Sequence, residues 1–141
     1  MAMKSILGIG NALTDILAVL PDDTLLKKYH LPLGSMQHVD MTTGDLIWQD
    51  LRKIGVQYVA GGSAANTITG TAIFGMPSGF IGKVGDDELG HLFKSDQEQY
   101  GIKSTLLKGQ NSSGRAMVFI TGANAERTFA VYLGAALELV P

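Results

Sequence analysis

The first hundred residues alternate short apolar runs with runs of helical spacing, and this alternation restricts the possible folds more than any other feature. Residues 4–10 (KSILGIG) form an apolar run that ends in glycine, as buried strands of parallel sheets often do. Residues 44–54 carry apolar side chains at helical spacing, with Thr42 or Thr43 as the expected N-cap. Further strand and helix runs follow, so the sequence predicts an α/β fold in which helices cover the faces of a parallel sheet.

The segment after Ile102 is different, because it contains strand-like runs and no helical run. The loop 121–126 (TGANAE) carries the turn residues of a hairpin, and Arg115 and Arg127 open its two strands, where each either faces a ligand or is solvated. We therefore predict a second, smaller sheet within a single domain, since 141 residues fit one domain. The strands expected in this segment are 102–107, 115–121 and 127–133.

Composition excludes several classes of function. The net charge is −2 without a basic cluster, so no nucleic-acid partner is expected. There is no cysteine, and His30, His38 and His91 match no metal-ligand spacing, so no metal site is predicted in this chain. No apolar stretch reaches the length of a signal peptide or a membrane span, so we expect a soluble, cytoplasmic protein without a membrane partner.

The first glycine motif, Gly8 to Leu13, follows a strand and is similar to a dinucleotide fingerprint. It does not fit one, because Leu13 stands at the third glycine position and a turn with proline follows in place of a helix. Asn11 and Asp15 remain as polar residues beyond a strand end, where open α/β sheets bind ligands. A carboxylate there accepts hydrogen bonds from two hydroxyls of a polyol, and the alternative is that Asp15 caps its own turn.

A second glycine motif, Gly61-Gly62-Ser63, lies between a strand-like run and a helix rich in small residues, with Asn66 about one turn further on. A glycine pair allows a ligand to approach the backbone, and the first turn of a helix offers free N–H groups to ligand oxygens. The alternative is a strand–turn–helix junction in which Ser63 is the cap. The acidic run after Gly85 is interpreted as a helix start, with Asp86 or Asp87 as its N-cap.

Taken in order, four stretches of the chain resemble the PfkB family of sugar and nucleoside kinases, and most closely its adenosine-kinase-like branch. The resemblance implies a ribokinase-like, three-layer α/β fold with a small β-sheet lid, of which residues 1–141 are the N-terminal, substrate-binding part. It places the lid strands near 16–20, 35–39, 115–121 and 127–133. The four stretches are GIGNALTD (8–15), AGGSAAN (60–66), IGKVGDDELG (81–90) and RTFAVYLGAA (127–136).

The resemblance also assigns roles to the residues of both glycine motifs. It implies that Asp15 and Asn66 bind the hydroxyls of a substrate sugar and that the backbone of the glycine pair lines the same pocket. Asn11 and Ser63 are similar to the adenosine-kinase-like branch, in which the Gly-Asn position lies near the substrate. The predicted substrate-binding residues are Asn11, Asp15, Gly61, Gly62, Ser63, Asn66 and Arg127.

Two stretches that the family uses for catalysis are missing from these 141 residues. There is no Gly-Ala-Gly-Asp stretch, which holds the family's catalytic base, and no Asn-x-x-Glu stretch for magnesium and phosphate. The resemblance therefore implies an N-terminal half without a catalytic residue, whose ATP and Mg²⁺ are bound mainly by a missing C-terminal half. The intact protein is expected to phosphorylate a primary hydroxyl of a nucleoside or sugar, and this chain alone is expected to be inactive.

Two further expectations concern partners. The family's lid often forms a dimer contact, so the resemblance implies a homodimer through the lid. The alternative to a kinase fragment is a natively short module that binds a sugar or nucleoside, or regulates another protein, without catalysis.

Overall fold

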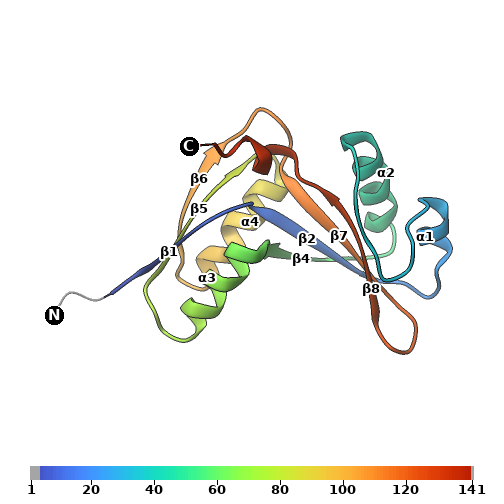
Figure 1. Ribbon diagram of the computed structural model, residues 1–141, viewed down its shortest axis with the longest axis horizontal. Helices are drawn as coiled ribbons and strands as arrows, with labels where there is room; N and C mark the ends of the chain where they lie inside the picture. The colour runs from blue at the N-terminus through green and yellow to red at the C-terminus, as the bar shows by residue number, and fades with distance from the viewer. Residues whose placement is uncertain (1–3, 141) are drawn as a thin grey trace. The chain divides into compact units, whose positions relative to one another are not determined.

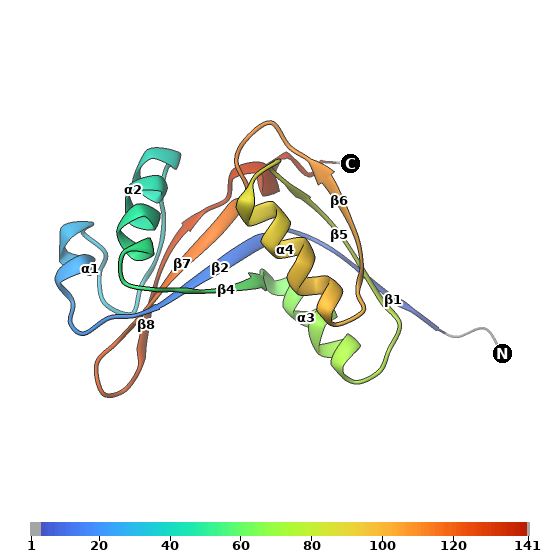
Figure 2. The same ribbon diagram turned by 180° about the vertical axis from the view of Figure 1, so that it is seen from behind.

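The computed structural model describes residues 4–140, which form two compact units (Figures 1 and 2). Unit 1 contains residues 4–14, 59–114 and 133–140, and unit 2 contains residues 15–58 and 115–132. This division does not test the expectation of a single domain, which stays a prediction. Each unit is built from segments that are distant in the sequence, so the length and composition of the chain could not predict where it divides.

Unit 1 contains a parallel sheet with the strand order β1-β5-β6. Its strands are β1 (Ile6–Ile9), β5 (Ser78–Val84) and β6 (Lys103–Lys108), and its helices are α3 (Ser63–Ile73) and α4 (Glu88–Gln99). The apolar runs are short and β-prone, and helices connect them, which is the arrangement that parallel pairing requires. The predicted α/β class is confirmed.

Both helices of unit 1 pack on the same face of this sheet. Gly8 lies opposite Phe80 in the register, so the two residues share a face. A Cβ on Gly8 would lie 2.4 Å from Ile68 of α3, and the ring of Phe80 lies 5.6 Å from that of Phe93 in α4. Figures 1 and 2 show α3 and α4 on one side of the strands. The short 3₁₀ helix η1 (Gly134–Glu138) also contacts β5.

Unit 2 holds most of a second sheet, whose strand order is β3-β8-β7-β2-β4. Strands β7 and β8 pair antiparallel, which confirms the predicted hairpin. The helices of both units are short, and no helix within residues 4–140 is long and apolar enough to cross a membrane. The elements are β2 (Leu13–Val19), β3 (Met36–His38), β4 (Gln57–Gly61), β7 (Gly114–Thr121), β8 (Glu126–Tyr132), α1 (Thr24–Lys28) and α2 (Met41–Arg52).

The sequence predicted the strands β4 and β6 but assigned each to the wrong sheet. We expected β4 in the parallel sheet, and it lies at the edge of the five-stranded sheet next to β2. We expected β6 in the smaller sheet, and it pairs with β5 in parallel, with Ile81 opposite Thr105. A short β-prone run has the same local signature in either sheet, so only its tertiary partners decide where it pairs.

The start of α2 also differs from the expectation. Its N-cap is Asp40, whose carboxylate accepts a hydrogen bond of 2.7 Å from the amide of Thr43. Thr42 and Thr43 therefore lie inside the first turn and do not cap it. Asp and Thr are both good N-caps, and the extended backbone that a cap requires occurs at Asp40 (φ −74°, ψ 173°).

A buried arginine lies in the core of unit 2. Arg115 is 1% exposed and pairs with Asp45 of α2. Its guanidinium lies 5.3 Å from the ring of Trp48 and 5.0 Å from that of Tyr132. Of the two interpretations of Arg115 in the sequence, a ligand contact or a solvated side chain, the structure supports neither. The side chain contributes to packing between α2 and β7.

Candidate functional site

The seven predicted site residues are divided between the two units, so each group is described by itself. Unit 1 contains the two glycine motifs, and unit 2 contains the other two site residues, an aspartate and an arginine. The residues of unit 1 are Asn11, Gly61, Gly62, Ser63 and Asn66, and those of unit 2 are Asp15 and Arg127.

Within unit 1 the structure brings the two glycine motifs together. Gly62 has a φ of +95° and a ψ of 145°, a backbone conformation that side chains with a Cβ rarely adopt. A Cβ at Gly62 would lie 2.5 Å from the carbonyl oxygen of Asn11. Only glycine therefore allows this close approach, which places the end of β4 beside the segment that follows β1.

The N-terminus of α3 is open at this point. Its N-cap is Gly62, which has no side chain to accept hydrogen bonds from the first turn, so the interpretation of Ser63 as the cap is wrong. Ser63 and Asn66 are exposed in this turn, as is Asn11 beside it. Free N–H groups at a helix N-terminus suit oxygen atoms of a ligand, and the hydroxyl and amide side chains add donors and acceptors of their own.

An aspartate that sequence reasoning missed holds the strand before the glycine pair. The amide of Ala60 donates a hydrogen bond of 2.8 Å to the carboxylate of Asp96 in α4. This bond satisfies a backbone donor of an edge strand and fixes the last residue before Gly61. A signal exists in the sequence, because Asp96 follows Leu89 and Phe93 at helical spacing and so falls on the apolar side of α4.

Asp15 lies in β2, and its side chain is partly buried. Burial raises the pKa of its carboxyl from 3.8 to about 6, because the charged form loses hydration. Arg127 lies in β8 opposite Ile120 and is exposed.

The raised pKa of Asp15 predicts a specific pH dependence of stability. The folded chain holds the proton up to about pH 6 and the unfolded chain releases it near 3.8, so this residue lowers stability as pH rises through that interval. We expect Asp15→Asn to be more stable than the parent at about pH 7.5, by at most about 3 kcal/mol, and equal to it near pH 3.5. Urea unfolding across this range measures the difference, and a variant that is less stable at both pH values would contradict the prediction.

Comparison with models of protein families decides the assignment. The model described as "pfkB family carbohydrate kinase" matches residues 35–141. This chain belongs to the pfkB family. The resemblance found in the sequence is thereby confirmed.

Several known proteins are similar to this pfkB-family chain along almost its whole length. "Adenosine kinase 2" of Arabidopsis thaliana is 29% identical over 93% of the chain and 38% of its own length. The adenosine kinase structure from Sinorhizobium meliloti matches with a TM-score of 0.81 and 35% identity, over 98% of this chain and 42% of that one. The Schistosoma mansoni adenosine kinase in complex with adenosine matches with a TM-score of 0.79 and 25% identity, over 97% of this chain and 40% of that one.

These neighbours confirm the ribokinase-like fold expected from the sequence. They also show that the chain spans about two fifths of the length of these adenosine kinases.

The acidic run of this pfkB-family chain has a structural role. Asp87 is the N-cap of α4 and accepts a hydrogen bond of 2.9 Å from the amide of Gly90, as predicted. Its carboxylate also accepts bonds from the amide and hydroxyl of Ser113, at 2.7 and 2.6 Å. Asp86 is exposed and pairs with Lys108 at 2.9 Å. The run therefore links α4 to the residue before β7 through the carboxylate of Asp87.

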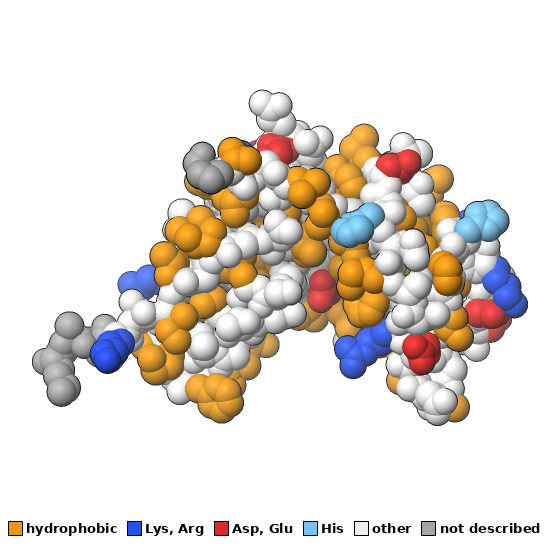
Figure 3. Space-filling model, viewed as in Figure 1, with side chains coloured by type: hydrophobic (Ala, Val, Ile, Leu, Met, Phe, Trp, Pro, Cys, Tyr) orange, Lys and Arg blue, Asp and Glu red, His pale blue; other side chains and the backbone are white. Residues whose placement is uncertain are grey.

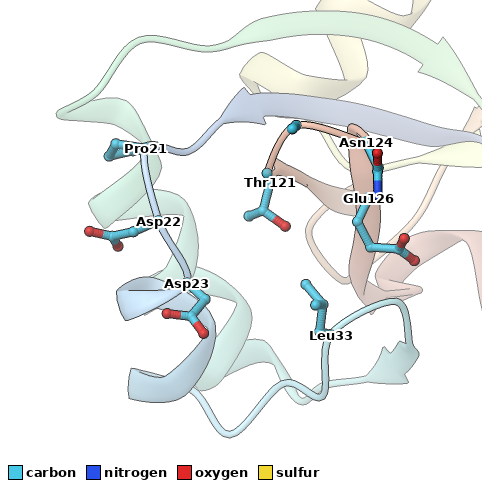
Figure 4. Close-up of a pocket in the computed structure, with 9 residues that line it drawn as sticks. Pro21, Asp22, Asp23, Leu33, Thr121, Asn124 and Glu126 are labelled. Carbon is cyan, nitrogen blue, oxygen red and sulfur yellow. The ribbon is translucent and has the colours of Figure 1, made fainter.

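A pocket of about 430 Å³ in unit 2 contains none of the predicted site residues (Figure 4). Two of the carboxylates that line it have local partners, since Asp22 accepts a hydrogen bond from the amide of Thr24 and Asp23 pairs with Lys27. In Figure 4 the side chains of Asp22 and Glu126 point in different directions. Among residues 4–140 no group of three or more His, Cys, Asp or Glu side chains is placed to hold a metal ion.

Proposed function

We propose that this chain binds the acceptor of an ATP-dependent kinase that phosphorylates a primary hydroxyl of a nucleoside or sugar. The observation that carries the proposal is the close approach of Gly62 to Asn11 beside the uncapped N-terminus of α3. This arrangement creates exposed donors and acceptors at the end of a strand, where α/β proteins bind small ligands.

In this proposal Asn66 of unit 1 and Asp15 of unit 2 each bind sugar hydroxyls, and the backbone of Gly61 and Gly62 adds contacts from unit 1. Asn11, Ser63 and Arg127 add polar contacts. Hydrogen bonds from hydroxyls to a carboxylate are stronger than those between neutral groups, so Asp15 is the residue that selects a polyol. We favour a nucleoside over a free sugar because the similar structures include several adenosine kinases, and the Schistosoma mansoni enzyme is in complex with adenosine.

We assign the binding of the phosphoryl donor, ATP, mainly to polypeptide other than residues 1–141. Transfer requires a nucleotide site and positioned charge, and the chain contains neither a Gly-Ala-Gly-Asp nor an Asn-x-x-Glu stretch. The residues described here also do not fit a magnesium site, because no cluster of carboxylates is present among residues 4–140. The proposal therefore includes inactivity of the chain alone, a cytoplasmic location where ATP is supplied, and a homodimer through the lid strands near 16–20, 35–39, 115–121 and 127–133.

Binding and turnover test the proposal separately. We expect isothermal titration to show adenosine binding to the 141-residue chain, and Asn66→Ala to weaken it at least about tenfold, since a lost bidentate amide removes roughly 1.5 kcal/mol or more. Thr67→Ala, at the next exposed position of α3, is the matched control and is expected to bind as the parent does. No binding of adenosine or of fructose by the parent chain would contradict the proposed function.

Turnover is measured with the same chain, ATP and Mg²⁺. We expect no phosphorylated adenosine or fructose above a blank without protein, because these residues include no catalytic base. Turnover above the blank would show that the chain carries its own donor site. Binding without turnover is also what a natively short binding module would show.

A further inference from the structure

Helix α4 is hydrogen-bonded to each of the two chain segments that carry the glycine motifs of unit 1. Near its N-terminus, the hydroxyl of Thr14 donates a hydrogen bond of 2.9 Å to the carbonyl oxygen of Leu89. About two turns further on, the carboxylate of Asp96 accepts the bond of 2.8 Å from the amide of Ala60. Thr14 follows Asn11 by three positions, and Ala60 directly precedes the glycine pair. One helix therefore holds both segments of the proposed site in unit 1.

The two points of attachment lie along one side of α4. Leu89 and Asp96 are seven positions apart, and Phe93 lies between them at helical spacing. Because a helix rises about 1.5 Å per residue, the two points are about 10 Å apart along its axis. They cannot approach each other unless hydrogen bonds within the helix break. The helix therefore fixes the distance between the two segments that it holds.

Apolar packing supports the same arrangement. Ala12, the neighbour of Asn11, and Ala60 belong to one buried apolar cluster with Phe93 of α4. The cluster is also tight on the strand side, because a Cβ at Gly82 of β5 would lie 3.0 Å from that of Ala12. Packing holds the two segments against α4, and the two hydrogen bonds fix where along the helix each segment lies.

α4 is itself attached near both of its ends. Its N-cap Asp87 accepts hydrogen bonds from the amide and the hydroxyl of Ser113. Near its C-terminus, the fully buried side chain of Gln97 accepts a hydrogen bond from the hydroxyl of Ser104 in β6. A helix that is held at both ends is a rigid support, and rigid supports hold binding groups more precisely than loops do.

This support lies on one side of the parallel sheet. Both helices of unit 1 pack on the face of Gly8 and Phe80. On the other face Leu7 and Ile9 are each 61% exposed, and Figure 3 shows apolar side chains at the surface of unit 1. The hydrogen bonds that fix the two segments of the proposed site therefore come from the helix side of unit 1.

We propose that α4 sets the separation of Asn11 and Gly62, and that Thr14 and Asp96 are positioning residues of the acceptor site. Neither side chain contacts the acceptor in this proposal, because each is hydrogen-bonded between α4 and the backbone or side chain of a neighbouring segment. Binding groups must be held to within about 0.5 Å of their productive geometry, so either bond affects affinity from a distance. The inference rests on the proposed function, since it names residues that hold the acceptor site in shape.

Amide signals in the NMR spectrum of the 141-residue chain test the proposal without a ligand. Asp96→Ala is expected to remove the protection of the Ala60 amide from hydrogen exchange and to shift the amide signal of Asn11 in the other segment. Thr14→Val removes the other hydrogen bond at nearly constant side-chain volume, and a shift of the Gly62 amide is expected. Shifts confined to the segment that carries each substitution would overturn the proposal.

Adenosine binding gives the functional readout. Asp96→Ala and Thr14→Val are each expected to weaken binding by about tenfold, because a small displacement of a binding group is enough to lower affinity. Asp96→Asn and Thr14→Ser keep the acceptor oxygen and the donor hydroxyl, so each is expected to recover most of the lost affinity. The double variant is expected to lose less than the product of the two single effects, since either loss alone frees the separation. Recovery by neither conservative variant, or independent effects in the double variant, would overturn the proposal.

Glu98→Ala is the matched control, because Glu98 is a carboxylate of the same helix that forms an exposed ion pair with Lys94 at 3.8 Å. It is expected to leave the Asn11 amide signal and adenosine binding unchanged. Circular dichroism is expected to show folded chains throughout, and Thr14→Val tests the proposal if Asp96→Ala does not fold. Loss of the fold in both variants would overturn the proposal, since the two bonds would then maintain the fold and not the site.

Failure of this inference and failure of the proposed function give different results. A parent chain that binds no adenosine contradicts the proposed function, and the amide signals of the variants still decide whether α4 positions the two segments. A parent chain that binds adenosine, with an affinity that neither Asp96→Ala nor Thr14→Val lowers, contradicts the positioning role and leaves the proposed function intact.

Discussion

Gly62→Ala is expected to destabilise the chain by roughly 2–4 kcal/mol and to abolish detectable adenosine binding. Two effects add. The substituted residue must hold φ +95° and ψ 145°, and its Cβ must occupy a point 2.5 Å from the carbonyl oxygen of Asn11. The backbone on at least one side must therefore move, and that movement displaces the two segments that the proposed site requires. Urea unfolding followed by circular dichroism measures the loss of stability.

Substitutions at two other glycines separate the cost of a strained backbone conformation from the cost of a steric clash. Gly75 has a φ of +82° but no atom within 4 Å of a Cβ, so Gly75→Ala is expected to cost only about 1 kcal/mol of strain. Gly70 lies inside α3 with open space around its Cβ, so Gly70→Ala is expected to be neutral or to stabilise by up to about 1 kcal/mol. If Gly62→Ala lowers the free energy of unfolding no more than Gly75→Ala does, the close approach of Gly62 to Asn11 contributes nothing to stability. That result would contradict the proposed site.

Asp87→Ala is expected to destabilise the chain by about 2–4 kcal/mol, although the residue belongs to an acidic run at the surface. The substitution removes the cap of α4 and leaves the amide and hydroxyl of Ser113, which is 1% exposed, without their acceptor. Asp87→Asn keeps an acceptor oxygen and is expected to lose less. Thermal and urea unfolding are the measurements.

The neighbouring carboxylate is the matched control. Asp86 is exposed and forms a surface ion pair with Lys108, so Asp86→Ala is expected to change stability by less than about 0.5 kcal/mol. Equal effects of the two substitutions would mean that the bonds to Ser113 contribute nothing. A large loss of adenosine binding in Asp86→Ala without loss of stability would point instead to a ligand role for the acidic run.

The residues behind the proposed site were only partly predictable. Asn11, Ser63 and Asn66 were assigned to the site through the resemblance to the family, because their pattern alone also fits a turn or a helix cap, and their role stays a prediction. Asp96 was missed, since its acceptor role depends on the amide of Ala60, which lies 36 positions earlier in the chain. The buried position of Arg115 was likewise not predictable, because it needs Asp45, which is 70 positions distant.

Local signals determined most of the elements. The spacing of apolar residues, and the glycines that end each run, predicted β1, α3, β5 and α4. Such signals are reliable here because backbone conformation and side-chain spacing are properties of a short segment. The same kind of signal identified the β7–β8 hairpin and the cap at Asp87.

Tertiary structure alone decided which sheet each strand joins, which face of β1-β5-β6 stays open and how the chain divides into units. The physical reason is that pairing and burial are contacts between distant segments, and a strand such as β4 or β6 has the same local preference for either sheet. The alternation of strands and helices thus predicted an α/β protein, and only the packing of both helices on one face of β1-β5-β6 showed that Leu7 and Ile9 are exposed on the other.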